Sequence, residues 1–331
     1  MSAYNITSSV RLLVLFILPF FLLSCSTLWT SLAFGPDYEP LQPTHQSVPS
    51  LEQIEPQWVP FVPGIELTSV FVQHPSLQFW GARVLLNHPS IQLQVGPEEI
   101  QNGIGKSVKP SVFTQHYGCN VVVNANPFDP SSAVEGELRR VVGIVVHEGK
   151  VLSFPHPKYA SLVFFFNKRA AVTDQSYLEI KNGQAILQSN LIQYAVGGFF
   201  RVLRDGETTA GGPKYLERAP RTAAGVNDQG TILFLLVIDG YRRSSVGATE
   251  EETGKILKKL GATNGLLLDG GGSSTFVIRQ PNGGVEVLNV PMHNRVPRQE
   301  RAVSLCLGVR SIPKPNEPAK DEEFTHLPMA W

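Results

Sequence analysis

The run that begins at Asp269 has the residue types of an anion-binding pocket. After the apolar residues 266–268 the chain reads Asp269, Gly270, Gly271, Gly272, Ser273 and Ser274. Successive glycines lose more backbone entropy on folding than other residues would, so bare backbone must be needed there. Without Cβ atoms, successive N–H groups can point at one anion while aspartate and serine side chains approach it from the sides. We predict a polar pocket at the carboxyl end of a strand, with a glycine-rich hairpin turn as the alternative.

A second aspartate occupies an equivalent place in the sequence. Asp239 follows the apolar run 231–238 and also precedes a glycine. If the strands before Asp239 and Asp269 are neighbours, both carboxylates should emerge at one sheet edge and enter one cleft. Other strand starts add further polar and charged groups, namely Arg221, Thr222, Glu300 and Arg301. Arginine matches phosphate or carboxylate oxygens with its planar fork, although capping of strand ends and surface ion pairing are the alternative roles.

The overall composition is that of a globular protein without a strong electric field. The chain has 331 residues, 42% of them apolar, and its 28 basic residues balance 28 acidic ones. This length is sufficient for a sizeable core. The balance gives no general attraction to nucleic acid or to an acidic membrane, so recognition of an anion must be local.

The N-terminal segment is predicted to be a secretory signal. Arg11 precedes the apolar run 12–23, which has the length of a signal core and is short for a membrane span. Residues 22–25 end in Cys25 and resemble a bacterial lipobox, and Ser26 resembles the pattern that sorts lipoproteins to the outer membrane. We expect residues 1–25 to form a lipoprotein-type signal peptide, with cleavage that leaves the lipidated Cys25 as the new N-terminus. The protein is then exported and lipid-anchored in the envelope, at the outer membrane or its periplasmic face. A secreted protein is the alternative.

Two linker segments and two cysteines complete the organisation. Residues 26–63 are rich in proline and lack periodicity, which predicts an extended tether, and residues 312–331 are predicted to be a loose tail. Between them, residues 64–311 form the expected domain. Cys119 and Cys306 lie in apolar runs, so a disulfide and a pair of buried thiols both remain open.

The pattern of this domain is mostly that of strands. Strands are expected over residues 65–72, 82–86, 91–95, 119–123, 141–146, 162–166, 185–188, 191–195, 199–203 and 303–309. A short helix is expected at 110–116, and residues 223–239 read as a hairpin. Thr249 is a helix N-cap and Gly261 the residue after that helix, which links strands 231–238 and 265–268 in a βαβ-like crossover. The predicted fold is α+β: mixed, mostly β sheets with a few packed helices in one compact catalytic domain.

A set of short motifs in this order resembles the phosphodiester glycosidase domain family over about residues 66–310. The motifs lie at 124–128, 197–199, 205–206, 220–225, 261–262, 268–274 and 300–301. One departure concerns the first of them, where the family has an Asn-Gly-Gly-Phe/Tyr-Phe run and this chain has Asn124, Ala125, Asn126, Pro127 and Phe128. Pro127 removes a backbone donor at that place.

The resemblance implies hydrolysis of the bond between a sugar C1 atom and a phosphodiester oxygen, in an envelope or extracellular glycoconjugate. A carboxylate can stabilise the oxocarbenium-like transition state or activate water, and cations and N–H groups can hold the phosphate. Asp269 or Asp239 is expected as base or nucleophile, with Glu300 as third acid or as a clamp for Arg301. The expected sugar or phosphate ligands are Arg221, Thr222, Arg301, Gly270, Gly271, Gly272, Ser273, Ser274, Asn124, Asn126, Gly197 and Gly198.

Other classes of function remain as alternatives or find less support. An envelope lipoprotein that binds an anionic glycan in the same pocket without cleaving it is the main alternative, and a purely structural lipoprotein is another. No cofactor is required; a divalent cation beside Asp239 and Asp269 is compatible with the sequence, but no ligand spacing demands one. Residues 105–107 lack the first glycine of a P-loop, and His147 with Glu148 lacks the second histidine of a metalloprotease. The aromatic run 164–166 fits a core better than a sugar platform.

Overall fold

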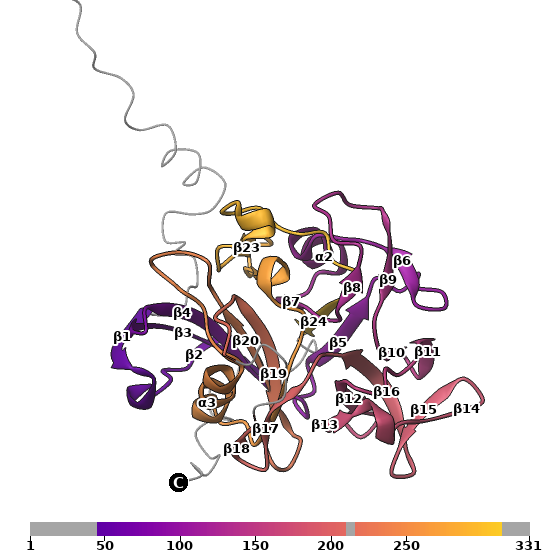
Figure 1. The fold of residues 1–331 in the computed structure, drawn as a ribbon. Coiled ribbons are helices and arrows are strands. Elements are labelled where there is room, and N and C mark those ends of the chain that lie inside the picture. The colour runs from indigo at the N-terminus through magenta and orange to yellow at the C-terminus, as the bar shows by residue number, and fades with distance from the viewer. Residues whose placement is uncertain (1–44, 210–215, 313–331) are drawn as a thin grey trace, which may run out of the picture. The chain divides into compact units, whose positions relative to one another are not determined.

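The computed structural model describes residues 45–209 and 216–312, and Figure 1 shows their arrangement. These residues belong to one compact unit of mostly β structure with two α-helices, which confirms the mostly-β α+β prediction. No helix among the described residues is long and apolar enough to cross a membrane. The signal segment, Cys25 and the C-terminal tail from residue 313 lie outside the described residues.

A nine-stranded sheet forms one layer of the unit. Its order is β1-β3-β4-β20-β19-β21-β17-β18, and β2 pairs with β3. Its strands are β1 (His45–Ser50), β2 (Val59–Val62), β3 (Ile65–His74), β4 (Leu77–Leu85), β17 (Arg201–Arg204), β18 (Glu207–Thr208), β19 (Arg221–Val226), β20 (Ile232–Ile238) and β21 (Asn264–Leu267).

Strand β20 is apolar throughout because both faces of this sheet are covered. Leu233, Leu235 and Val237 face the main core, while the residues that alternate with them face a second apolar cluster. Helix α3 (Glu250–Leu260) contributes Ile256 and Leu257 to that second cluster. A continuous apolar run is the pattern expected of a strand buried on both sides.

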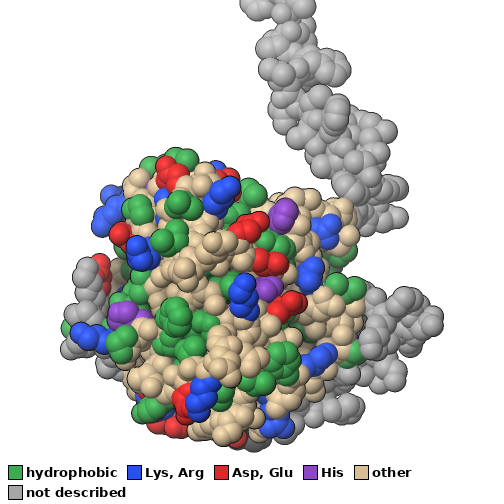
Figure 2. Space-filling view, turned by 90° about the vertical axis from the view of Figure 1, so that its right-hand side faces the viewer, with side chains coloured by type: hydrophobic (Ala, Val, Ile, Leu, Met, Phe, Trp, Pro, Cys, Tyr) green, Lys and Arg blue, Asp and Glu red, His purple; other side chains and the backbone are tan. Residues whose placement is uncertain are grey.

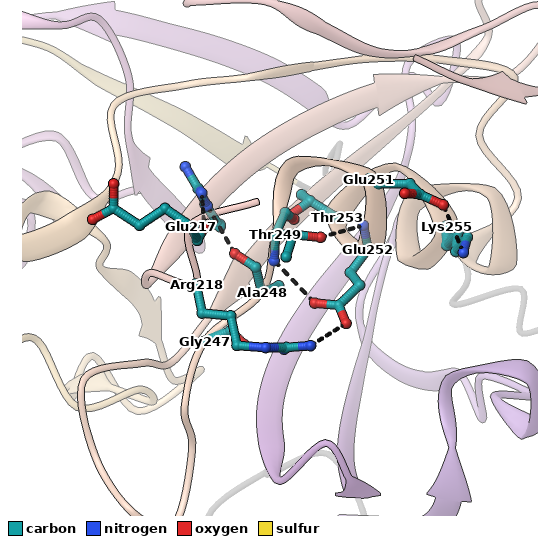
Figure 3. Close-up of polar contacts among 10 residues, drawn as sticks. Glu217, Arg218, Gly247, Ala248, Thr249, Glu251, Glu252, Thr253 and Lys255 are labelled. Atoms are coloured by element: carbon teal, nitrogen blue, oxygen red, sulfur yellow. Dashed lines mark hydrogen bonds and ion pairs between the residues drawn. The ribbon is translucent and has the colours of Figure 1, made fainter. Parts of the chain in front are cut away.

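Helix α3 begins at the residue that the sequence predicts. Thr249 Oγ1 accepts a hydrogen bond from Glu252 N at 3.1 Å, and Glu252 Oε2 accepts one from Thr249 N at 2.9 Å (Figure 3). Arg218 binds the other oxygen of Glu252 at 2.5 Å, which ties the loop before β19 to the helix start. Gly261 ends the helix with φ of +108° and donates to the Lys258 carbonyl oxygen. This capping box satisfies backbone donors that would otherwise lack partners.

The crossover from β20 through α3 to β21 differs from the expectation in one respect. The two strands are not neighbours, because β19 lies between them and pairs antiparallel with both. Since each is antiparallel to β19, β20 and β21 run in the same direction. Asp239 and Asp269 therefore still emerge at one edge of the sheet, and Arg221 begins β19 at that same edge.

A five-stranded sheet forms the opposite wall of the main core, in the order β23-β22-β7-β24-β5. In β7, Val121 and Val123 face the main core, whereas Val122 faces helix α2 (Pro110–Tyr117) and its Phe113. The strands of this sheet are β5 (Ile91–Gly96), β7 (Val121–Asn124), β22 (Phe276–Arg279), β23 (Val285–Val287) and β24 (Cys306–Ser311). Cys119 and Cys306 are both buried and both free thiols.

Two further sheets and several short helices complete the unit. The seven-stranded sheet consists of β10 (Val145–His147), β11 (Lys150–Ser153), β12 (Ala160–Phe165), β13 (Ala170–Asp174), β14 (Glu179–Lys181), β15 (Gln184–Leu187) and β16 (Asn190–Gly197). The three-stranded sheet consists of β6 (Ile104–Lys106), β8 (Phe128–Asp129) and β9 (Leu138–Val141). The 3-10 helices are η1 (Leu51–Gln53), η2 (Gln175–Tyr177), η3 (Gly271–Ser273) and η4 (His293–Arg295).

The tether expected over residues 26–63 needs correction in its second half. Strand β1 pairs parallel with β3, and β2 pairs antiparallel with β3. Leu51 and Ile54 are buried between these strands and the rest of the unit. The prolines of this segment suggest a tether, but edge strands tolerate proline, and the few apolar residues of the segment are sufficient to pack it against the unit.

One expected strand is in fact two. The run 141–146 divides between β9 and β10, which belong to different sheets. Gly143, with φ of +88°, and Ile144, whose N–H donates to Gln175 Oε1, lie at the break. An apolar run alone does not reveal a turn of this kind, since the residues on both sides of it are buried.

Candidate functional site

Asn124, the last residue of β7, joins the five-stranded and nine-stranded sheets at the edge where Asp269 emerges. Its Nδ2 donates to the Asp269 carbonyl oxygen at 2.5 Å, and its Oδ1 accepts from Thr222 Oγ1 at 2.7 Å. The same Oδ1 accepts from Thr275 N at 3.2 Å. Asn124 and Thr222 are fully buried, so both residues position the backbone around Asp269 and neither presents a free polar group to solvent.

Asp269 is a partly exposed residue whose carboxyl group lies in a desolvated setting. Burial raises its pKa to about 6, against the opposing effects of a Ser273 hydrogen bond, the Arg301 charge and the Gly270 N–H. A carboxylate with such a pKa is a stronger base than an ordinary aspartate and is still mostly ionised at neutral pH. Its environment therefore suits proton transfer.

The glycine run uses most of its N–H groups inside the protein. Gly271 N donates to the Pro220 carbonyl oxygen, and the N–H groups of Ser273 and Ser274 close the turn of η3 onto Gly270 and Gly271. An anion at this site would thus find fewer free backbone donors than the sequence suggests. The missing Cβ serves another purpose at Gly272, where that atom would lie 2.6 Å from Arg301 Nη2.

Arg301 lies against this bare backbone and is held by two side chains. Its Nη1 donates to Ser273 Oγ at 3.1 Å, and its Nε donates to His293 Nδ1 at 3.0 Å. Because Nδ1 accepts, the neutral His293 ring carries its proton on Nε2. Burial, and then the Arg301 charge, lower the pKa of His293, which keeps the ring neutral. Arg301 is partly exposed, so its guanidinium can meet a bound anion.

His293 is absent from the sequence-based candidates. It lies in η4, in a stretch of polar residues and prolines without strand or helix periodicity. No local pattern distinguishes it from a loop residue. Only the fold, which brings η4 against η3, shows that it contacts Arg301.

Asp239 differs from Asp269 in being fully buried, with partners on both carboxylate oxygens. Oδ1 accepts from Val290 N at 3.0 Å and from Asn289 Nδ2 at 3.2 Å, and Oδ2 forms an ion pair with Arg242. Burial raises the pKa of Asp239, and these three partners oppose that rise. Asn289 also donates to the Ser274 carbonyl oxygen, so Asp239 supports the loop that follows the glycine run.

Arg221 begins β19 at the same edge, but much of its guanidinium is occupied. Nε donates to the Ala248 carbonyl oxygen at 3.0 Å, and Nη2 donates to the Glu217 carbonyl oxygen at 2.6 Å. Burial lowers the pKa of Arg221. This arginine ties the loop before α3 to the loop before β19.

Four of the predicted residues are used elsewhere in the structure. Glu300 accepts from Ser111 N at 3.0 Å and from Ser111 Oγ at 2.5 Å, so it caps the start of helix α2. Both of its carboxylate oxygens are used in these bonds, and neither bond involves Arg301. Burial raises the pKa of Glu300. Asn126 accepts from Gly197 N and donates to the carbonyl oxygens of Val142 and Ile144. Gly198 permits a close approach, since a Cβ there would lie 2.2 Å from the Leu267 carbonyl oxygen.

The structure thus brings together Asp269, the glycine run, Ser273, Arg301 and His293, with Asn124, Thr222 and Asp239 as buried supports. The buried Ser274 hydroxyl has no partner among the described residues. In residues 45–209 and 216–312, no group of three or more His, Cys, Asp and Glu side chains could hold a metal ion. This arrangement can accept a proton at Asp269 and hold a negative group at Arg301.

Comparison with known sequences agrees with this chemistry. A model of the phosphodiester glycosidase family matches residues 117–310, which include β7, the glycine run and Arg301. None of the curated proteins matches the chain.

Solved structures share the fold at low identity. A hypothetical protein from Synechocystis is 15% identical with a TM-score of 0.59, and the match covers 78% of this chain and 64% of that one. The chain thus spans less than two thirds of that relative. The catalytic domain of zebrafish N-acetylglucosamine-1-phosphodiester alpha-N-acetylglucosaminidase, auto-inhibited by pro-peptide, is 20% identical with a TM-score of 0.56, and 78% of this chain covers 88% of it.

Proposed function

Because the chain belongs to the phosphodiester glycosidase family, we propose that it hydrolyses the bond between a sugar C1 atom and a phosphodiester oxygen at the site around Asp269. One observation carries the proposal: Asp269, a partly exposed residue whose carboxyl group has a pKa of about 6, lies in the field of the Arg301 guanidinium. Base and cation are the two groups that this reaction needs on opposite sides of the bond.

Asp269 is the base in this proposal. Water attacks C1 while the Asp269 carboxylate takes a proton from it, and the C1–O bond breaks with its electron pair moving to the phosphate oxygen. The sugar leaves with a hydroxyl at C1, and the other product is a phosphomonoester. Such a leaving group is already stable as an anion, so the reaction has little need of a strong general acid.

Arg301 holds the phosphate in this scheme. Two of its nitrogens are fixed by His293 and Ser273, and Nη2 lies over Gly272 without a partner among the described residues. A guanidinium held on two sides loses little further freedom when it binds an anion. The cation also stabilises the negative charge that develops on the leaving oxygen.

Asp239 is assigned a positioning role. Both of its oxygens are occupied and it has no solvent exposure, so it cannot reach a substrate without breaking its bonds to Val290, Asn289 and Arg242. Its contacts hold the loop 289–290 against Ser274. Of the two aspartates that end β20 and β21, Asp269 alone has the exposure that catalysis requires.

The test is sugar release from N-acetylglucosamine-1-phosphodiesters, the substrate class in the name of the zebrafish relative. The panel should include glucose- and galactose-1-phosphodiesters, which test the specificity for the sugar. We expect release by the full-length protein and a loss of about 10²- to 10⁴-fold in Asp269→Asn.

The matched control is Asp228→Asn, which changes an exposed aspartate in the turn between β19 and β20. It should release sugar like the wild type. Binding of the diesters without release by the wild type would instead favour the non-catalytic glycan-binding alternative.

We also propose that the protein is exported and attached to the envelope through lipid on Cys25. The support is the sequence alone, namely the apolar run 12–23 and the lipobox-like residues that end in Cys25. In cells labelled with a fatty acid, the wild type should carry label and Cys25→Ser should not. Label on neither protein, with the wild type in the medium, would support secretion.

A further inference from the structure

A cavity of about 700 Å³ lies apart from the Asp269 site, between β5 and the seven-stranded sheet. Its volume is within the range of small-molecule sites. Its wall includes Gln92 and Gln94 of β5, Arg310 of β24, and Gln193 and Tyr194 of β16. The molecule is viewed from the side of the seven-stranded sheet in Figure 2, which shows acidic, basic and histidine side chains gathered near the middle of that face.

Strand register separates this cavity from the candidate active site. Cys306 pairs with Asn124 and with Gly96, so the start of β24 and the end of β5 lie at the Asp269 edge. Arg310 pairs with Gln92 at the other end of the same two strands. Four residues along a strand span about 13 Å, so Gln92 and Arg310 lie at the end of these strands that is away from Asp269.

The cavity combines aromatic rings with amide groups. Tyr117, Phe165 and Tyr194 supply the rings, and three glutamines supply donors and acceptors. His147 packs edge-on against Tyr194, with ring centroids 5.4 Å apart, and its Nδ1 bonds the Val95 carbonyl oxygen at 2.7 Å. Sugar rings present apolar C–H faces and a rim of hydroxyl groups, so they match a site that offers aromatic faces and amide hydrogen bonds together.

The two acids of the cavity already have partners. Glu98 Oε1 accepts from Gln94 Nε2 at 2.8 Å and lies 3.7 Å from His147 Nε2. Glu148 is exposed to solvent and lies close enough to Tyr194 to help raise the pKa of its hydroxyl. Neither carboxylate therefore needs a ligand to balance its negative charge.

The three cations have weaker partners. Arg310 makes contacts of 3.5 Å to the Tyr117 carbonyl oxygen and 3.3 Å to Gln92, and its buried Nε has no partner among the described residues. Within residues 45–209 and 216–312, the single hydrogen bond of Lys168 Nζ is to the His88 carbonyl oxygen, at 3.4 Å. The Arg169 guanidinium, next to it in the turn between β12 and β13, has no hydrogen-bond or ion-pair partner in the part of the chain that the structure describes.

We propose that this cavity is a second binding site, for a saccharide that carries an anionic group. The rings of Tyr194 and Tyr117 contact the sugar face, the glutamine amides bind its hydroxyls, and Arg310, Lys168 and Arg169 bind the negative group. Carboxylated and phosphorylated sugars share this chemistry. The site does not depend on hydrolysis at Asp269, so it holds the glycan whether or not that reaction occurs.

Calorimetric titration of the full-length protein at low salt tests the proposal. The probes are trigalacturonate for the carboxylate form and glucose 6-phosphate for the phosphate form, with the methyl-esterified trimer and glucose as neutral controls. At least one anionic probe should bind with a Kd below about 1 mM, at least about tenfold tighter than its neutral control. Which probe binds identifies the source of the charge.

Variants locate the binding. The double variant Lys168→Gln, Arg169→Gln removes both exposed cations of the turn. It should raise the Kd at least about tenfold and leave sugar release at Asp269 unchanged. Arg140→Gln, an exposed arginine on β9, should leave the Kd unchanged, and so should Asp269→Asn. The proposal is overturned if neither probe binds below about 1 mM, if the double variant binds like the wild type, or if Asp269→Asn abolishes binding.

Discussion

Asn124 Nδ2 donates to the carbonyl oxygen of Asp269 at 2.5 Å, and this bond connects the end of β7 in the five-stranded sheet to the end of β21 in the nine-stranded sheet. Asp269 N returns a bond of 2.8 Å to the Ala125 carbonyl oxygen. The backbone of Asp269 is therefore fixed on both sides, while its side chain stays partly exposed. Rigid placement of a reacting group lowers the cost of reaching the transition state.

Replacing Asn124 should harm both stability and activity. Asn124→Ala leaves Thr222 Oγ1 and Thr275 N buried without their acceptor, and each unsatisfied group costs about 1–3 kcal/mol. We expect the free energy of unfolding in urea to fall by about 2–4 kcal/mol. Asn190→Ala, at an exposed position, should change it by less than about 0.5 kcal/mol. Equal effects of the two changes would show that Asn124 does not join the sheets.

The pH dependence of sugar release should follow the ionisation of Asp269. With a pKa of about 6, the carboxylate is the active form of the base, so kcat/KM should rise through pH 6 and level off above pH 7. Below pH 6 it should fall about tenfold per pH unit. A profile in which kcat/KM falls between pH 5 and pH 7 would assign Asp269 the role of an acid.

Asp269 should also cost the protein stability at neutral pH. Its pKa is about 6 in the folded protein and near 3.8 when unfolded, so between these values the folded state binds more protons and stability decreases as the pH rises. Asp269→Asn removes this cost. The variant should match the wild type near pH 3.5 and exceed it by up to about 3 kcal/mol above pH 6 in denaturant titrations. A difference that does not vary with pH would contradict the raised pKa.

A lysine should not replace Arg301. The single ammonium of Arg301→Lys cannot bind His293 Nδ1 and Ser273 Oγ while still facing Gly272, as the guanidinium does. We expect KM to rise and kcat to fall, with a loss of about 100-fold in kcat/KM. Arg298→Lys, an exposed position in the same loop, provides the control and should remain near wild-type activity. Unchanged kinetics in Arg301→Lys would remove Arg301 from phosphate binding.

The sequence predicted Asp239 and Asp269 at one sheet edge on the condition that the strands before them are neighbours, because each acid directly follows an apolar strand. It could not show that β19 lies between those strands, since the pairing of β19 with β21 joins segments that are distant in the chain. It also could not distinguish the two acids. Their different roles depend on Val290, Asn289 and Arg242, which occupy Asp239 and not Asp269.

Neighbours in the sequence were misleading at Glu300 and Arg301. Successive residues of an extended segment point to opposite sides, so Arg301 meets the glycine run while Glu300 meets Ser111 at the start of α2. Asn126 shows the same limit. Its amide serves the backbone of Gly197, Val142 and Ile144, which no spacing in the sequence relates to it.

The position of bond cleavage tests the central claim most directly. Hydrolysis of an N-acetylglucosamine-1-phosphodiester in water enriched in ¹⁸O, followed by mass spectrometry of both products, shows which atom the water attacked. Attack at C1 with Asp269 as base predicts that the label enters the sugar and that Asp269→Asn greatly slows its appearance. Label in the phosphate would mean that the P–O bond breaks, and would contradict the proposed glycosidase reaction.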